Sequence, residues 1–154
     1  MFVRDFIHVA QPFESVAPRF VADASWLNGL AEDAAANARQ LTGSVRLVAP
    51  PRGADGRRAG TVQCETGPVR VRRDSLVVPL HIAGSDGEAL PTLEADLEVS
   101  PVGPGLSQLT LSATYRRTGP SAADDAIVQR AAEVVARTFL QALAGRIDED
   151  DGGS

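Results

Sequence analysis

The chain has 154 residues, a formal net charge of -5 and 44% hydrophobic residues, which fits one globular domain with its own core. All 15 basic residues are arginine, and the absence of lysine excludes Schiff-base catalysis and a Walker A phosphate loop. With two histidines and the single Cys64, the sequence has no soft-ligand set for structural zinc and cannot form an internal disulfide.

The negative charge is concentrated at the C-terminal end. Asp148, Glu149, Asp150 and Asp151 supply four negative charges, so the remaining chain is close to neutral and presents no basic field to a nucleic acid. We expect a single domain over residues 1–147 and a disordered acidic tail over 148–154. No signal-peptide pattern and no apolar run of about 20 residues is visible, which favours a cytoplasmic protein without a membrane span.

The first third of the chain predicts one strand followed by two helices. Phe2 to Val9 is β-prone without clean alternation, which leaves the orientation of His8 open. A short helix is expected from Pro12, with a break or kink near Pro18. A second helix is expected from about Ala24 to Leu41, where apolar residues recur at helical spacing.

Six strand-like segments follow, separated by turns rich in Gly, Pro, Asp and Ser. Pro79 is unfavourable in a central strand and indicates a bulge or a local edge. In the segment with the cleanest alternation, Glu94, Asp96 and Glu98 oppose an apolar face, so we interpret them as a solvated outer face. The six segments are residues 44–49, 61–66, 69–73, 76–83, 92–100 and 108–116.

The stretch from Ser121 to about Arg146 predicts one long amphipathic helix with a broad apolar face. Consecutive strands joined by short turns form an antiparallel sheet with one buried face, which this helix can cover. The sequence therefore predicts an α+β fold. It consists of a curved antiparallel sheet of about seven strands, two short N-terminal helices and a long C-terminal helix, with an apolar cavity between sheet and helix.

This order of elements resembles the helix-grip fold of the START/Bet v 1-like superfamily, also called SRPBCC or polyketide cyclase-like. Residues 6–16 look like that superfamily's opening strand, proline and short helix. Residues 78–80, 93–101, 109–116 and 128–140 are similar to an uncharacterised actinobacterial branch. The resemblance implies binding of lipids, steroids, polyketides or hormones, or cyclase or dehydratase activity. The matching motifs are patterns of apolar spacing and contain no catalytic signature.

Few side chains in such a cavity could perform chemistry. Tyr115 falls on the apolar face of its strand, where its hydroxyl needs a partner such as a ligand or a backbone carbonyl. His8 could orient a ligand or act as a general base if it points inward. His81 is expected to form a surface pair with Thr92 or Glu94. Cys64 is expected to be a small buried hydrophobe.

We therefore expect the protein to bind a small hydrophobic or amphipathic molecule between the sheet and the last helix, without catalysis, cofactor or metal. One alternative is a polyketide cyclase/dehydratase-like enzyme that uses His8 or Tyr115 for proton transfer. Another is a protein-interaction module with a collapsed cavity. The sequence does not indicate the oligomeric state. The candidate ligand-binding residues are His8, Trp26, Leu97, Leu111, Tyr115, Val135 and Phe139.

Overall fold

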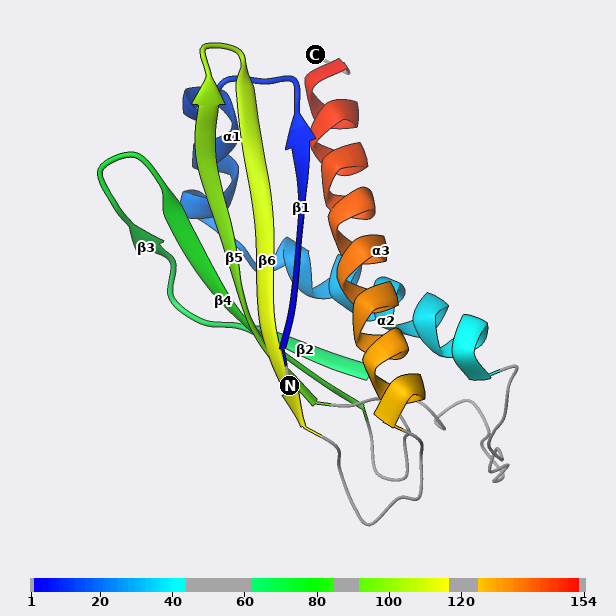
Figure 1. Ribbon diagram of the computed structural model, residues 1–154. Helices are drawn as coiled ribbons and strands as arrows, with labels where there is room; N and C mark the ends of the chain where they lie inside the picture. Colours follow the sequence, from blue (N-terminus) through cyan, green and yellow to red (C-terminus); the bar gives the residue numbers. More distant parts are fainter. Residues whose placement is uncertain (1, 44–61, 85–91, 117–124, 153–154) are drawn as a thin grey trace.

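The computed structural model describes residues 2–43, 62–84, 92–116 and 125–152, which form one sheet and three helices (Figure 1). The strand expected at residues 44–49 lies outside this range. The strands are β1 (Phe2–Val9), β2 (Val62–Thr66), β3 (Arg70–Val71), β4 (Leu76–Gly84), β5 (Thr92–Gly103) and β6 (Leu106–Arg116). The helices are α1 (Phe13–Ala22), α2 (Trp26–Gly43) and α3 (Asp125–Gly152).

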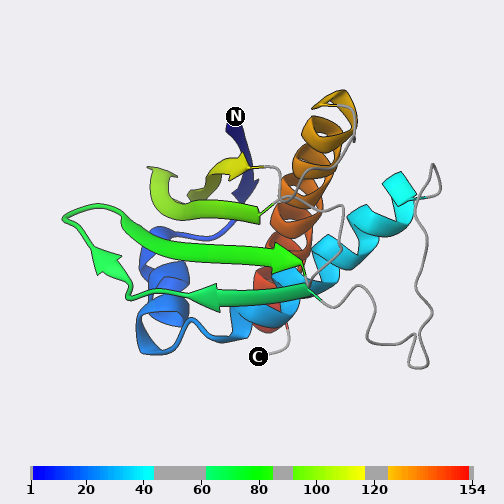
Figure 2. The same ribbon diagram turned by 90° about the horizontal axis from the view of Figure 1, so that it is seen from below.

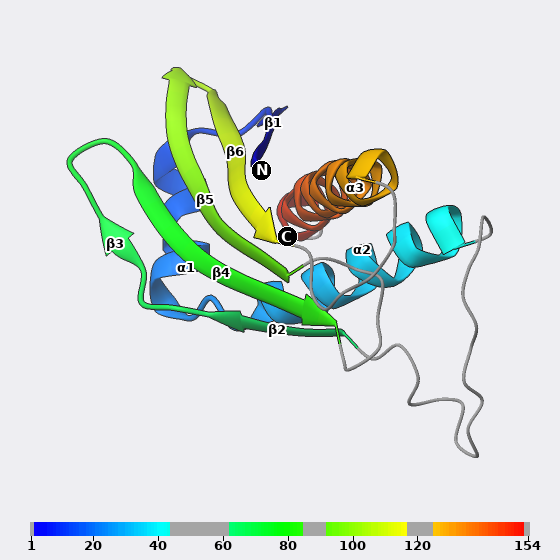
Figure 3. The same ribbon diagram turned by 60° about the horizontal axis from the view of Figure 1, so that its bottom comes forward.

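The sheet is antiparallel, with the strand order β1-β6-β5-β4-β2 and with β3 paired to β4 beside β2. The first strand pairs with the last, so β1 and β2 lie at the two edges. The strands curve (Figure 2), and a view nearly along α3 shows them in an arc on one side of that helix (Figure 3). The expected α+β architecture, a curved antiparallel sheet gripping a long C-terminal helix, is confirmed.

Strand β5 shows how the sheet separates its two faces. Leu93, Ala95 and Leu97 are buried on the inner face, toward the helices, whereas Glu94 and Asp96 are exposed on the outer face. This alternation follows from the two-residue repeat of an extended chain. The interpretation of the acidic residues of this strand as an outer face is confirmed.

The apolar and polar residues of β1 do not alternate cleanly, because a charged residue near its centre lies on the inner face. Val3 and Val9 are buried on the inner face, and Phe2 and Phe6 are 57% and 52% exposed on the outer face. Asp5 shares the inner face with the two valines. Its Oδ1 atom accepts a 2.8 Å hydrogen bond from Arg137 of α3 and another of 2.8 Å from the backbone N–H of Phe6. The ion pair with α3 lets a carboxylate occupy an inner-face position at a sheet edge.

The expected break at Pro18 does not occur, because α1 continues through it to Ala22. A proline inside a helix removes the hydrogen bond to the carbonyl four residues earlier, here that of Glu14. Glu14 and Pro18 both lie on the exposed side of α1, so water can satisfy that carbonyl. The prediction of a break was wrong, because the solvated side of a short helix tolerates this loss, and the kink that was its alternative stays a prediction.

The expected local edge at Pro79 is confirmed. Strand β3 pairs with Leu76 and Val77, and β2 pairs with β4 only from Leu80 onward, so Pro79 lies in the gap between them. Its carbonyl accepts a 2.9 Å hydrogen bond from the N–H of Gly67 on that side. A Cβ atom on Gly67 would lie 3.2 Å from the Cβ of Pro79, so this close approach favours glycine.

Helix α3 is longer than the sequence pattern indicates and includes residues 148–151 of the expected acidic tail. Carboxylates at a helix C-terminus oppose the helix dipole, so charge does not favour these last turns. No helix in the described part of the chain combines the length and apolarity needed to cross a membrane. The buried residues of α3 are Ala131, Ala132, Val135, Ala136, Phe139, Leu140, Leu143, Ala144 and Ile147.

Candidate functional site

The helices enclose the inner face of the sheet from its two edges. Helix α3 packs closest to β1 at one edge, α2 packs against β2 at the other, and the two helices pack against each other (Figures 1 and 3). Helix α1 covers part of β5 and β6. The inner faces of the central strands β4 and β5 therefore face an apolar layer that they share with the three helices.

Side-chain size changes along this layer. The C-terminal half of α3 contributes Phe139, Leu140 and Leu143, all fully buried. The N-terminal half contributes Ala131 and Ala132, near the end of the sheet where β5 begins and β6 ends. There Ala95 and Ala113 form one inner-face pair of β5 and β6, between the larger pairs Leu93–Tyr115 and Leu97–Leu111.

The apolar residues proposed from the sequence lie in this layer. Leu97 and Leu111 are cross-strand partners on β5 and β6 and are buried. Val135 and Phe139 are buried on α3 and belong to the same hydrophobic core. The structure thus places all four residues in the apolar interior between sheet and helices.

Trp26 lies at the junction between α1 and α2, and only part of its side chain is buried. Its ring centroid is 5.4 Å from that of Phe20, and its Nε1 atom donates a 3.1 Å hydrogen bond to the carbonyl of Arg19. The guanidinium carbon of Arg146 lies 5.8 Å from the indole centroid. These contacts fix the indole at the margin of the layer.

Tyr115 is buried at the end of β6, and its hydroxyl donates a hydrogen bond to Oε1 of Gln129 on α3. Nε2 of Gln129 in turn donates a 2.9 Å hydrogen bond to Oε2 of Glu133. The partner of the tyrosine is therefore a side-chain amide of α3. This chain of three polar groups marks the end of the layer with small side chains.

His8 lies on the outer face of β1, on the opposite side of the sheet from α3. Its Nε2 atom is 3.0 Å from Oε1 of Gln108 on β6, and its ring centroid is 5.5 Å from that of Phe6. The sheet backbone separates this ring from the layer between sheet and helix. Contact between His8 and a ligand in that layer does not fit this position.

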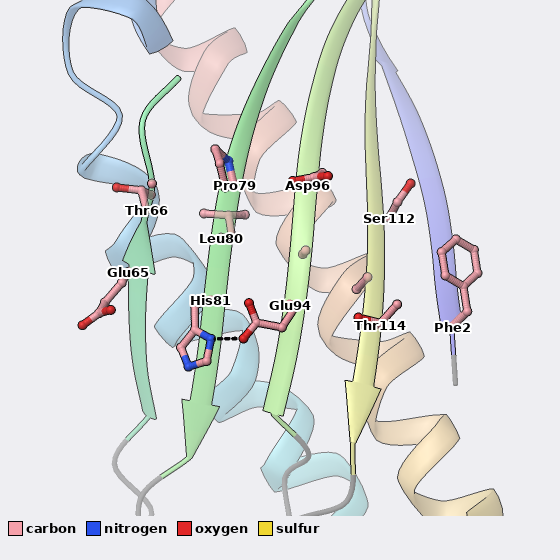
Figure 4. A pocket seen from close by; sticks show the side chains of 13 residues that line it. Phe2, Glu65, Thr66, Pro79, Leu80, His81, Glu94, Asp96, Ser112 and Thr114 are labelled. Carbon is pink, nitrogen blue, oxygen red and sulfur yellow. Dashed lines mark hydrogen bonds and ion pairs between the residues drawn. The ribbon is translucent and has the colours of Figure 1, made fainter. Parts of the chain in front are cut away.

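A hollow of about 530 Å³ lies on the outer face, above strands β2, β4, β5 and β6. Figure 4 shows it with the helices behind the strands. A row of register partners crosses it, from Glu65 through His81, Glu94 and Thr114 to Phe2. Nδ1 of His81 is hydrogen-bonded to Oε2 of Glu94, which confirms the expected surface pair.

This outer hollow is acidic and open to solvent. Asp96 pairs with Arg70 at 3.6 Å, with both side chains more than half exposed. Within the described ranges, no group of three or more His, Cys, Asp or Glu side chains is arranged to hold a metal ion. Exposed pairs of this kind contribute little free energy, so we assign them to the solvated surface.

A second hollow, of about 450 Å³, lies between the edge strand β1 and helix α3. Sequence reasoning missed it, because its residues come from opposite ends of the chain and share no motif. The lining residues are Val3, Arg4, Asp5, Arg130, Glu133, Val134, Arg137 and Thr138.

Cys64 is buried on the inner face of β2, and its backbone N–H donates a 3.3 Å hydrogen bond to Oε2 of Glu32 on α2. Burial, with smaller contributions from the charges of Glu32 and Glu65, raises the pKa of the thiol to about 12. A thiol with this pKa stays protonated at neutral pH and is a poor nucleophile. The expectation of a small buried hydrophobe is confirmed.

No family model matches the sequence, and no curated protein shows a significant sequence match. Solved structures do match over nearly the whole chain. A conserved protein from Geobacillus kaustophilus aligns with a TM-score of 0.55 and 14% identity, covering 97% of this chain and 96% of the other.

A START superfamily protein from Mycobacterium smegmatis aligns with a TM-score of 0.50 and 16% identity, covering 96% of this chain and 97% of the other. At these identities the similarity shows the fold alone, the helix-grip fold that this START superfamily protein also has.

Proposed function

We propose that the protein binds a small hydrophobic or amphipathic molecule between the sheet and α3 and performs no reaction on it. The observation that carries this proposal is the enclosure of an entirely apolar inner face of β4 and β5 by helices that pack closest to the sheet edges. Apolar burial of a ligand in such a layer contributes about 25 cal/mol per Å² of surface removed from water.

The ligand is placed at the end of the layer with small side chains. Ala95, Ala113, Ala131 and Ala132 are small, buried side chains at this end, and Tyr115 supplies a hydroxyl there. Small side chains leave the most room for a ligand, and one polar group beside an apolar surround can orient it.

The residues named from the sequence receive different roles in this proposal. Leu97, Leu111 and Val135 form apolar walls, and Phe139 closes the layer toward the C-terminal end of α3. The Tyr115 hydroxyl orients a polar group of the ligand, and Trp26 borders the layer from outside. A cytoplasmic location and kinship with the actinobacterial branch belong to the same proposal.

A collapsed layer that serves only as the core of an interaction module is the second candidate. It is favoured by the full burial of Phe20 and Phe139, two of the largest side chains of the interior. The two candidates differ in whether the small-residue end holds a ligand or only protein atoms. A substitution that adds volume at this end separates them.

The test is Ala113→Leu, on the inner face of β6, with Ala144→Leu on α3 as the control at the end with large side chains. If a ligand site exists, Ala113→Leu keeps the stability within about 1 kcal/mol and abolishes saturable binding of an apolar dye. In a packed layer the added volume destabilises by roughly 1–3 kcal/mol. Native mass spectrometry of freshly purified protein identifies any co-purifying molecule, and its conversion by the wild type would reveal an enzyme.

A further inference from the structure

The hydrogen bond between Tyr115 and Gln129 has a fixed direction, which supports an inference that rests on the proposed function. Nε2 of Gln129 donates a 2.9 Å hydrogen bond to Oε2 of Glu133, and Nη1 of Arg130 lies 3.8 Å from the other carboxylate oxygen. A carboxylate has no proton to donate and only accepts hydrogen bonds. The amide of Gln129 must therefore present its NH2 group to Glu133.

This orientation of the amide decides what the hydroxyl of Tyr115 can do. With its NH2 group held by Glu133, Gln129 turns its Oε1 atom toward Tyr115, and the tyrosine hydroxyl donates its single proton to that oxygen. The reverse orientation would place the amide oxygen against the carboxylate of Glu133, with no proton between the two acceptors. Toward any further group, the tyrosine oxygen therefore acts as an acceptor through its lone pairs.

The hydroxyl of Tyr115 lies where the proposed ligand position borders α3. Tyr115 comes from the inner face of β6 and is 4% exposed. Its partner Gln129 lies within one turn of Ala131 and Ala132, two of the small side chains at this end of the layer. A polar ligand group at this end meets an oxygen whose proton is already committed. A ligand group that can only accept would stay unpaired there, which costs free energy in a desolvated place.

We propose that the ligand presents a hydrogen-bond donor, such as the hydroxyl of an alcohol or phenol, to the oxygen of Tyr115. Gln129 and Glu133 set this preference, because together they hold the tyrosine proton. They are positioning residues that act through Tyr115 and need no contact with the ligand. Molecules whose polar group is a ketone, ester or ether oxygen are disfavoured, since this oxygen would face the lone pairs of Tyr115.

Substitutions on α3 should change the preference while Tyr115 stays in place. Gln129→Leu removes the acceptor of the tyrosine proton, so the hydroxyl can donate to a ligand oxygen. Glu133→Gln replaces the carboxylate by an amide that can donate or accept, so the amide of Gln129 can take either orientation. Gln129 is partly buried and Glu133 is exposed, so both variants should stay folded, and circular dichroism checks this.

The experiment compares 2-naphthol with 2-methoxynaphthalene, which share one ring system and differ in whether the oxygen carries a proton. Isothermal titration is run on the full chain at neutral pH, where 2-naphthol keeps its proton, for the wild type, Tyr115→Phe, Gln129→Leu and Glu133→Gln. Gln141→Leu is the matched control, because Gln141 is exposed on the same helix about three turns beyond Gln129. The quantity compared is the ratio of the two affinities, in which the size difference between the probes is common to all variants.

Relative to Tyr115→Phe, the wild type should favour 2-naphthol over 2-methoxynaphthalene by roughly 3–10-fold, the scale of one hydrogen bond. Gln129→Leu should abolish or reverse this preference, because the tyrosine proton becomes available to the ether oxygen. Glu133→Gln should reduce the preference, and Gln141→Leu should leave it unchanged.

An affinity ratio that is the same in the wild type and in Tyr115→Phe, with both probes bound, would overturn the donor preference and keep the proposed function. A wild-type preference for 2-naphthol that persists in both Gln129→Leu and Glu133→Gln would also overturn the proposal, because the amide would not set the direction. Saturable binding of neither probe would overturn the donor preference and the proposed function together.

Discussion

The side-chain Nε2 atom of Gln11 donates a 3.2 Å hydrogen bond to the backbone carbonyl of Ile147. Gln11 follows β1 and is buried, and Ile147 lies near the C-terminal end of α3. The backbone carbonyl of Gln11 also accepts a 2.8 Å hydrogen bond from the hydroxyl of Ser107 at the start of β6. One buried residue therefore joins the chain after β1, the start of β6 and the end of α3.

Gln11→Ala should destabilise the fold by about 0.5–1.5 kcal/mol, because it removes a buried hydrogen bond to the carbonyl of Ile147. Urea denaturation measures the change in the free energy of unfolding. Gln141→Ala, on the exposed side of α3, is the control and should stay within about 0.5 kcal/mol. A Gln11 variant as stable as this control would show that water replaces the side chain.

Phe139→Ala should destabilise by roughly 3–5 kcal/mol, since the ring is fully buried between α3 and the sheet. The same denaturant melts test it, with Val102→Ala as the control at a side chain that is 45% exposed. A loss under about 1 kcal/mol for Phe139→Ala would contradict this packing and would require a site that collapses around the smaller side chain.

Cys64 predicts a pH dependence of stability in the alkaline range. Burial raises the pKa of its thiol from 9.0 to about 12, so between these values the folded state retains a proton that the unfolded state has lost. The contribution of the Cys64 thiol to the free energy of unfolding is fully present below pH 9.0. It falls as the pH rises above this value, by up to about 1.4 kcal/mol per pH unit.

Denaturant melts at successive alkaline pH values measure this slope, and Cys64→Ala should reduce it by that amount. Iodoacetamide at neutral pH should label native protein far more slowly than unfolded protein. Rapid labelling of the native thiol would show that β2 opens readily or that the thiol is accessible.

His8→Gln should leave the affinity for an apolar ligand unchanged, because His8 lies on the outer face of the sheet. Tyr115→Phe should weaken it by at most about tenfold, the scale of one hydrogen bond. Dye displacement or titration compares the two variants with the wild type. An effect of His8→Gln larger than that of Tyr115→Phe would place the ligand on the other face.

The parts of the fold that could be predicted from sequence are those decided by local pattern. The alternation in β5 and the apolar stripe of α3 each indicate one buried face, and both elements are present with that face buried, although α3 extends further than expected. In strand β1, alternation alone does not show which residues face the interior. Its inner-face carboxylate, Asp5, is stabilised by Arg137, which lies 132 residues away in the chain.

The candidate sites were less accessible to sequence reasoning. The burial of Tyr115 followed from strand parity, but its partner Gln129 depends on how α3 lies against β6. The residues that line the hollow between β1 and α3 come together only after β1 has paired with β6 and α3 has packed beside it. Such groups of residues are adjacent only in the folded protein, so their spacing in the sequence does not predict them.

Asp5 has a further consequence for how the molecule behaves in concentrated solution. An edge strand with unpaired backbone groups and two exposed phenylalanines invites another chain to add as a neighbouring strand, and intermolecular β-sheet can grow from such a contact. The carboxylate of Asp5 holds the N–H of Phe6, one of the groups that an incoming strand needs. An incoming strand must therefore displace the Asp5 carboxylate from this N–H, and a charged side chain at a sheet edge opposes such edge-to-edge pairing.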